Sequence, residues 1–209
     1  APGERVLVDG DTEAAAALFR VLAGVWPWGR GHVDLPADAG MIALGPKPFL
    51  PEGSLRQALG FPQQSGEHDD TALVAALDSV GLPYLAGRLE ETGDWVRLLN
   101  PAELQRLSIA RLLLLRPNWI LLGEATNALD PDSAGKLLGL LSERLPDSGI
   151  VLIGRHPGST EPFHRRLTLQ RAAGGEVLLH EVYARRQAAK VPRPRPLSVI
   201  DRLREGYGG

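Results

Sequence analysis

Two uninterrupted apolar runs constrain the fold of this chain more than any other feature. Residues 119–122 read Trp-Ile-Leu-Leu, and residues 150–153 read Ile-Val-Leu-Ile. A strand without polar alternation is typical of a parallel sheet that helices cover on both faces. Shorter runs predict one more buried strand at residues 5–8 and a short strand at residues 41–44.

Helical spacing fills the stretches between these strands. We predict helices over residues 12–23, 101–115 and 133–145. Gly24 ends the first helix, and Pro101 suits the first turn of the second. Strands that alternate with helices predict an α/β fold with a mainly parallel sheet.

The middle and the end of the chain have different patterns. Residues 54–92 are mostly helical in spacing, so we predict an inserted helical subdomain over about residues 52–117 of a domain at 1–183. Residues 167–169 and 177–179 flank a Gly-Gly pair and predict a terminal hairpin. Residues 184–209 are basic and Pro-rich, which favours an extended, solvated tail. The alternative for this tail is a contact with anionic headgroups or nucleic acid.

Composition excludes several classes of protein. The chain has 209 residues, a formal net charge of −2 and no cysteine. Disulfides and thiolate metal sites are therefore excluded, and no strong overall charge attracts nucleic acid or anionic lipid. No apolar run approaches the ~20 residues that a membrane helix needs. If the protein serves a membrane, we expect another segment or chain to cross it.

Several segments resemble motifs of one protein family, and they follow one another in the order found in that family. Residues 94–106 read Asp-Trp-Val-Arg-Leu-Leu-Asn-Pro-Ala-Glu-Leu-Gln-Arg, and residues 119–130 read Trp-Ile-Leu-Leu-Gly-Glu-Ala-Thr-Asn-Ala-Leu-Asp. They are similar to the signature segment (D-W-x-x-x-L-S-x-G-E-Q-Q-R) and to the Walker B strand with D-loop (φφφφ-D-E-A-T-S-A-L-D) of ABC ATPases. Residues 48–56 and 22–29 resemble the segments that follow the Q-loop and the Walker A helix. The chain thus resembles the nucleotide-binding domain of an ABC transporter. It is most similar to the branch of peroxisomal fatty-acyl transporters and bacterial fused permease–ATPases.

This resemblance implies a P-loop NTPase-like fold, with a mainly parallel sheet flanked by helices and an inserted helical subdomain. It implies ATP and Mg²⁺ as cofactors. The implied partners are a transmembrane permease domain and a second nucleotide-binding domain, and nucleic acid is not expected. The implied location is the cytoplasmic side of a membrane, either peripheral or within a membrane-bound transporter. Family members carry about two strands before the point where this chain starts, so we expect a domain cut from a longer polypeptide.

The positions that would bind phosphate are substituted. In the family, the Walker A glycines let backbone N–H groups surround the phosphates, its lysine neutralises them and its hydroxyl binds Mg²⁺. Ala15 stands at the lysine position and Ala16 at the hydroxyl position. The degenerate Walker A comprises Gly10, Asp11, Thr12, Glu13, Ala14, Ala15, Ala16 and Ala17. We predict that Asp11 or Thr12 caps the helix without nucleotide, and that Ala15→Lys alone improves ATP binding slightly.

Three further motifs have lost ligands. Pro46 stands at the position of the Q-loop glutamine, and Gly123 stands at the position of the Walker B aspartate. In the signature, Asn100 and Ala102 replace the serine and the glycine that would meet the partner's γ-phosphate, and Pro101 lies between them. The adjacent Glu103 matches the family. No metal-binding residues are predicted in this chain.

Three functional residues of the family are retained. Glu124 corresponds to the residue that polarises the attacking water, and His156 to the switch histidine. An idle glutamate bonded to a neighbour and a histidine on a surface loop are the alternatives. Asp130 matches the D-loop acid but precedes Pro131, so a capping role is an equal alternative.

These residues lead to one functional hypothesis and three alternatives. We predict a degenerate cassette that serves a permease as a coupling and dimerisation module, with hydrolysis absent or very weak. The first alternative is a weakly active ATPase that powers transport through Glu124 and His156. The second is an ABC-type protein outside transport, and the third is a decaying gene with no selected role.

Overall fold

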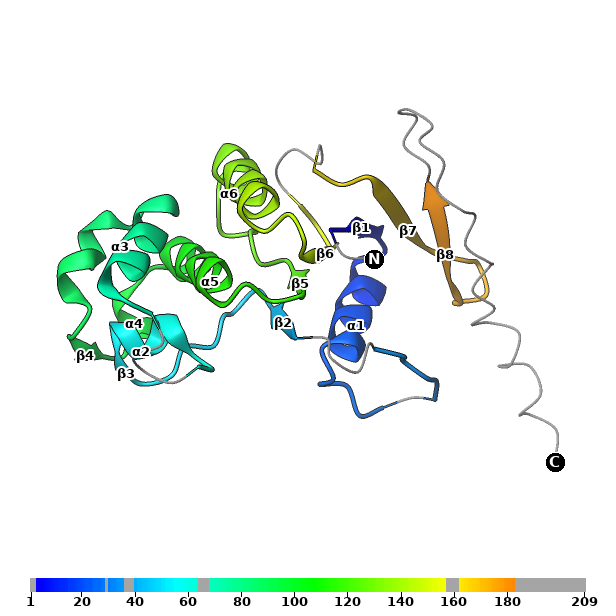
Figure 1. The fold of residues 1–209 in the computed structure, drawn as a ribbon. Coiled ribbons are helices and arrows are strands. Elements are labelled where there is room, and N and C mark those ends of the chain that lie inside the picture. Colours follow the sequence, from blue (N-terminus) through cyan, green and yellow to red (C-terminus); the bar gives the residue numbers. More distant parts are fainter. Residues whose placement is uncertain (1–2, 29, 36–39, 64–67, 157–161, 183–209) are drawn as a thin grey trace.

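The computed structural model describes residues 3–28, 30–35, 40–63, 68–156 and 162–182. A six-stranded sheet has the order β2-β5-β6-β1-β7-β8 (Figure 1). Its strands are β1 (Arg5–Gly10), β2 (Met41–Leu44), β5 (Trp119–Gly123), β6 (Gly149–Ile153), β7 (Arg165–Arg171) and β8 (Val177–Val182). Strands β2, β5, β6, β1 and β7 run parallel to one another, and β8 pairs with β7 as an antiparallel hairpin. The predicted α/β fold with a mainly parallel sheet is confirmed.

The strands alternate between two buried faces because successive side chains of a strand point to opposite sides. Leu7, Ile120, Leu122, Ile150 and Leu152 belong to the larger core cluster. This cluster also contains apolar residues of helices α5 (Pro101–Leu115) and α6 (Pro131–Arg144). The intervening strand residues, among them Val8, Leu121 and Ile153, belong to a second cluster with helix α1 (Thr12–Leu22). The sheet is thus covered on both faces, as its apolar runs predict.

A helical group lies to one side of the sheet, at the left of Figure 1. It contains α2 (Leu55–Gly60), α3 (Asp70–Ser79), the 3-10 helix η1 (Pro83–Arg88) and α4 (Trp95–Leu98). Strands β3 (Gly53–Ser54) and β4 (Thr92–Gly93) pair as a small antiparallel ribbon. Trp95 is 1% exposed and donates its indole N–H to the carbonyl oxygen of Gly53 at 3.1 Å. α5 packs against α2, α3 and α6, and so joins this group to the sheet.

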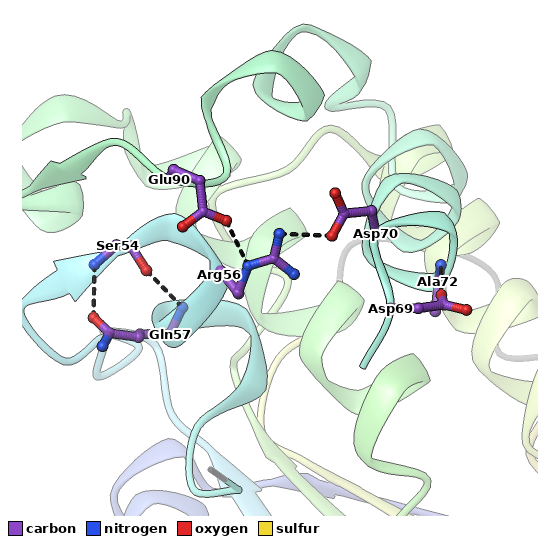
Figure 2. Close-up of polar contacts among 7 residues, drawn as sticks. All are labelled: Ser54, Arg56, Gln57, Asp69, Asp70, Ala72 and Glu90. Carbon is purple, nitrogen blue, oxygen red and sulfur yellow. Dashed lines mark hydrogen bonds and ion pairs between the residues drawn. The ribbon is translucent and has the colours of Figure 1, made fainter. Parts of the chain in front are cut away.

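Polar contacts join the first helices of this group (Figure 2). Ser54 and Gln57 form a reciprocal capping box that starts α2. The guanidinium of Arg56 bridges Glu90 and Asp70, with both N···O distances 2.6 Å. Arg56 therefore ties α2 to the turn after η1 and to the start of α3.

Most predicted elements match the structure within one or two residues. One correction is the start of the helix predicted over residues 133–145, since α6 begins at Pro131. The reason is that Asp130 caps this helix, and a proline is well suited to its first turn. The boundaries near residues 52, 117 and 183 stay predictions, and the tail at 184–209 lies outside the described residues. Within the described part of the chain, no helix has the length and apolar character needed to cross a membrane.

Candidate functional site

The segment in the Walker A position is a single-residue connection followed by helix. β1 ends at Gly10, and Asp11 caps α1, which starts at Thr12. Gly10 has a φ of +106°, and a Cβ atom here would lie 2.1 Å from the carbonyl oxygen of Leu169. Asp11 donates its backbone N–H to that same oxygen at 2.8 Å. A phosphate-binding loop needs several successive N–H groups around one anion. Here Asp11 alone separates the strand from the helix.

Ala15, at the lysine position, faces the interior of the protein. It is 2% exposed and belongs to the core cluster with Val8, Leu121 and Ile153. A lysine in its place would start from these apolar surroundings. The structure therefore argues against our expectation that Ala15→Lys alone would improve ATP binding.

The carboxylates of this segment are paired with arginines of β7. Arg166 donates its Nε–H to Asp9 at 2.7 Å. Arg171 donates to both carboxylate oxygens of Asp11, at 2.8 and 3.0 Å, and to Glu13 at 3.0 Å. The hydrogen bonds from Arg171, followed by the one from the Ala14 N–H, lower the pKa of Asp11 to about 2. Sequence reasoning missed both arginines, and the only signal was the recurrence of Arg along residues 165–171.

This pKa predicts a pH dependence of stability. The folded pKa of Asp11 lies below its ordinary value of 3.8, so its stabilisation is fully present above about pH 4 and is lost as pH falls towards 2. Asp11→Asn keeps the cap but removes the charge. We expect the wild-type protein to have a higher melting temperature than Asp11→Asn at pH 5, and this difference in melting temperature to shrink by pH 2.5. A difference in melting temperature that is constant with pH would contradict this prediction.

A cavity of about 240 Å³ lies beside this connection. It places His156 together with the start of the degenerate Walker A, although these segments lie far apart in the sequence. Its lining residues are Leu7, Asp9, Gly10, Thr12, Gly154, Arg155, His156 and Arg166. Ala15, Ala16 and Ala17 do not line it.

Phe19 occupies the space beside the Walker B position. A Cβ atom on Gly123 would lie 2.4 Å from the Phe19 ring, and one on Gly45 would lie 3.6 Å from it. Gly45 directly precedes Pro46, whose exposed ring offers no ligand atom. The Phe19 ring, carried by α1, therefore fills the space between the Q-loop and Walker B positions.

These residues do not fit a magnesium nucleotide. Ala16 and Gly123 carry no ligand atom, and an aspartate at position 123 would collide with Phe19. Ala14 uses its backbone N–H to bind the Asp11 side chain. The geometry offers neither a cation for the phosphates nor a carboxylate for the metal at the family's positions.

Glu124 has an unusual backbone conformation. Its φ is +53°, a left-handed value that residues other than glycine rarely adopt. Its backbone N–H donates to the Ile153 carbonyl at 3.2 Å, and its carboxylate accepts from the Asn127 side chain at 3.5 Å. The strained turn directs Glu124 towards Gly154, where an added Cβ atom would lie 2.9 Å from the Glu124 Cγ.

The signature position is a well-formed helix start. Asn100 accepts from the Glu103 N–H at 2.9 Å, and Glu103 accepts from the Asn100 N–H at 2.9 Å. Pro101 occupies the first turn, where a missing N–H costs no helical hydrogen bond. Tyr84 donates its hydroxyl to the other Glu103 oxygen at 2.7 Å. Burial, and then this bond, raise the pKa of Tyr84 to about 12. Ala102 is half-buried against the larger core.

The signature helix is tied to the D-loop segment. Gln105, 2% exposed, donates to the Asn127 side chain at 2.9 Å and accepts from the Ala128 N–H at 3.0 Å. Asp130 caps α6 by accepting from the Ser133 N–H at 2.9 Å. Bonds from Ser133 lower the pKa of Asp130. In this structure Asp130 makes the capping contact that the sequence offered as one of its two roles.

Known proteins are similar to this chain. No family model matches it. The inner membrane ABC transporter ATP-binding protein YddA of Escherichia coli is 36% identical over 162 residues, which is 75% of this chain and 28% of that protein. The human lysosomal cobalamin transporter ABCD4 is 35% identical over 188 residues, or 83% of this chain and 30% of that protein. The chain thus spans less than a third of the length of these relatives.

A solved structure supports the same fold. The structure of a bacterial Atm1-family ABC exporter with ATP bound superposes with a TM-score of 0.64 at 20% identity, and covers 81% of this chain and 32% of that one. The chain therefore belongs to the ATP-binding proteins of ABC transporters, among relatives that include the D subfamily.

Proposed function

We propose that this chain is an ATP-binding cassette domain that has lost hydrolysis and serves an ABC transporter as a coupling and dimerisation module. The observation that carries the proposal is the packing at the Walker positions. Ala15 is buried in the core, and Phe19 fills the space beside Gly123.

Phosphoryl transfer depends on positioning and on neutralising charge at the phosphates. The chain has lost these contributions together: the phosphate cation at Ala15, metal ligands at Ala16 and Gly123, and the Q-loop ligand at Pro46. Asp9, Asp11 and Glu13 are paired with only two arginines, Arg166 and Arg171, so this cluster keeps a formal charge of −1 (−3 + 2). The contributions to catalysis of residues that act together in a site are not additive, so the one retained glutamate contributes little alone.

The proposed partners are a transmembrane permease and a second cassette domain, with this domain at the cytoplasmic side of the membrane. In a cassette pair, the Walker face of one domain meets the signature face of the other. A homodimer of this chain would hold two damaged sites. A working ATP-driven transporter therefore requires a partner with better motifs. The signature start at Asn100 and Glu103, with its full set of caps, supports a remaining role at such an interface.

A weakly active ATPase is the second candidate. Two observations favour it. Glu124 keeps a strained conformation, which proteins retain mostly at functional sites. His156 also lines the cavity beside the Walker segment.

Binding and hydrolysis of ATP distinguish the two candidates. Ligand at about 100 times its Kd would stabilise an intact cassette by about 2.7 kcal/mol. We expect this chain to show little or no rise in melting temperature with Mg-ATP and no phosphate release above background. The test compares the wild-type protein with Glu124→Gln, and with Glu143→Gln on an exposed face of α6 as a matched control. Turnover that Glu124→Gln alone abolishes would refute the proposed function.

A further inference from the structure

The carboxylates at the start of α1 and the arginines of β7 form one network across the edge of the sheet. We call it the β7 clamp, and it comprises Asp9, Asp11, Glu13, Arg166 and Arg171. Each carboxylate receives at least one guanidinium hydrogen bond of 3.0 Å or less. The paired residues are 157 to 160 positions apart in the sequence, so tertiary structure alone brings them together.

The register of the sheet determines which arginine meets which carboxylate. β1 and β7 pair in parallel, with Asp9 opposite Thr168 and Gly10 opposite Leu169. Arg171 follows the buried Leu169 by two positions, so it lies on the face that α1 covers. Arg166 precedes Thr168 by two positions and lies on the opposite face, where Thr168 also donates to Asp9 at 2.9 Å. The clamp therefore holds both faces of the strand end.

The chemistry of this edge is the reverse of an anion site. A helix N-terminus attracts anions, and here that place is occupied by the side chain of Asp11. Arg171 in turn binds both oxygens of Asp11, in the bidentate geometry that guanidinium and carboxylate groups share. Asp11 and Asp9 side chains are only 20% exposed, so the pairs are partly shielded from solvent.

We infer that the start of α1 has changed from an anion site to a guanidinium site. The β7 clamp, with Arg171 as its internal ligand, fixes α1 against the β7–β8 hairpin without nucleotide. This inference deepens the proposed function and rests on it, because it explains how the domain keeps this edge ordered without bound phosphate.

Amide hydrogen exchange of the full chain without nucleotide tests the clamp. Arg171 is 41% exposed, and ion pairs that solvent reaches are weakened by screening, so its loss should have a modest effect. We therefore expect Arg171→Ala to speed exchange at Ala14 and Ala15 by about three- to tenfold, with little change at α3 or α6. Arg171→Lys keeps the charge but loses the bidentate fork, so its exchange rates at Ala14 and Ala15 should lie between those of the wild type and of Arg171→Ala. Arg144→Ala, an exposed arginine of α6, is the matched control and should leave α1 unchanged.

Chemical rescue tests the identity of the ligand. In Arg171→Ala, guanidinium chloride at tens of millimolar should restore part of the lost protection at Ala14 and Ala15, whereas sodium chloride at the same ionic strength should not. Unchanged exchange in Arg171→Ala would overturn the inference, and so would recovery that sodium produces equally well. ATP turnover by the unmodified chain would instead refute the proposed function, and it would do so without altering the exchange result.

Discussion

Ala15→Lys is expected to lower the free energy of unfolding by about 3–5 kcal/mol, the cost of leaving a charge buried without a partner. Ala15 is 2% exposed, and its neighbours in the core include Val8, Leu121 and Ile153. None of these offers a hydrogen-bond acceptor in its side chain. The ammonium group must therefore displace the helix or lose its proton. We expect no gain in Mg-ATP binding.

Urea unfolding followed by circular dichroism measures this loss. Ala75→Lys is the matched control, because Ala75 is an exposed residue of α3 and should change stability by no more than about 0.5 kcal/mol. A stable Ala15→Lys protein whose melting temperature rises with Mg-ATP would show that position 15 faces a nucleotide. It would overturn our account of the Walker A segment.

Gly123→Asp is expected to destabilise the domain by about 3 kcal/mol or more, instead of restoring a metal ligand. The added Cβ atom would lie 2.4 Å from the Phe19 ring, and the carboxylate would enter a buried strand end. Removing the ring should relieve part of this strain. Gly123→Asp should therefore cost less in a Phe19→Ala background than in the wild type, with a coupling energy of about 0.5–3 kcal/mol.

The four proteins of this double-mutant cycle can be compared by urea unfolding. Gly139→Asp provides the control, because a Cβ atom at Gly139 of α6 meets nothing within 4 Å. Additive effects of Gly123→Asp and Phe19→Ala would mean that the ring does not fill the former metal position. Binding of Mg²⁺ by the double variant would show instead that the site can be reopened.

Local interactions explain why several elements were predictable. The start of α5 is written within four residues, because Asn100 and Glu103 cap each other and Pro101 fits the turn between them. Asp11 caps α1 through a bond to Ala14, only three positions away. The apolar runs at β5 and β6 are buried on both sides, which follows from their lack of polar alternation.

The sequence by itself determined the family, the order of strands and helices, and the loss of each ligand-bearing side chain at the Walker and Q-loop positions. Only the tertiary structure decided what replaced them. The face of α1 that carries Ala15 depends on how the helix lies on the sheet, and Phe19 meets Gly123 only because α1 crosses β5. Arg166 and Arg171 reach the α1 carboxylates because the parallel register of β1 and β7 aligns residues about 160 positions apart. Such long-range pairings carry no local pattern, since each arginine alone resembles any exposed charge on an edge hairpin.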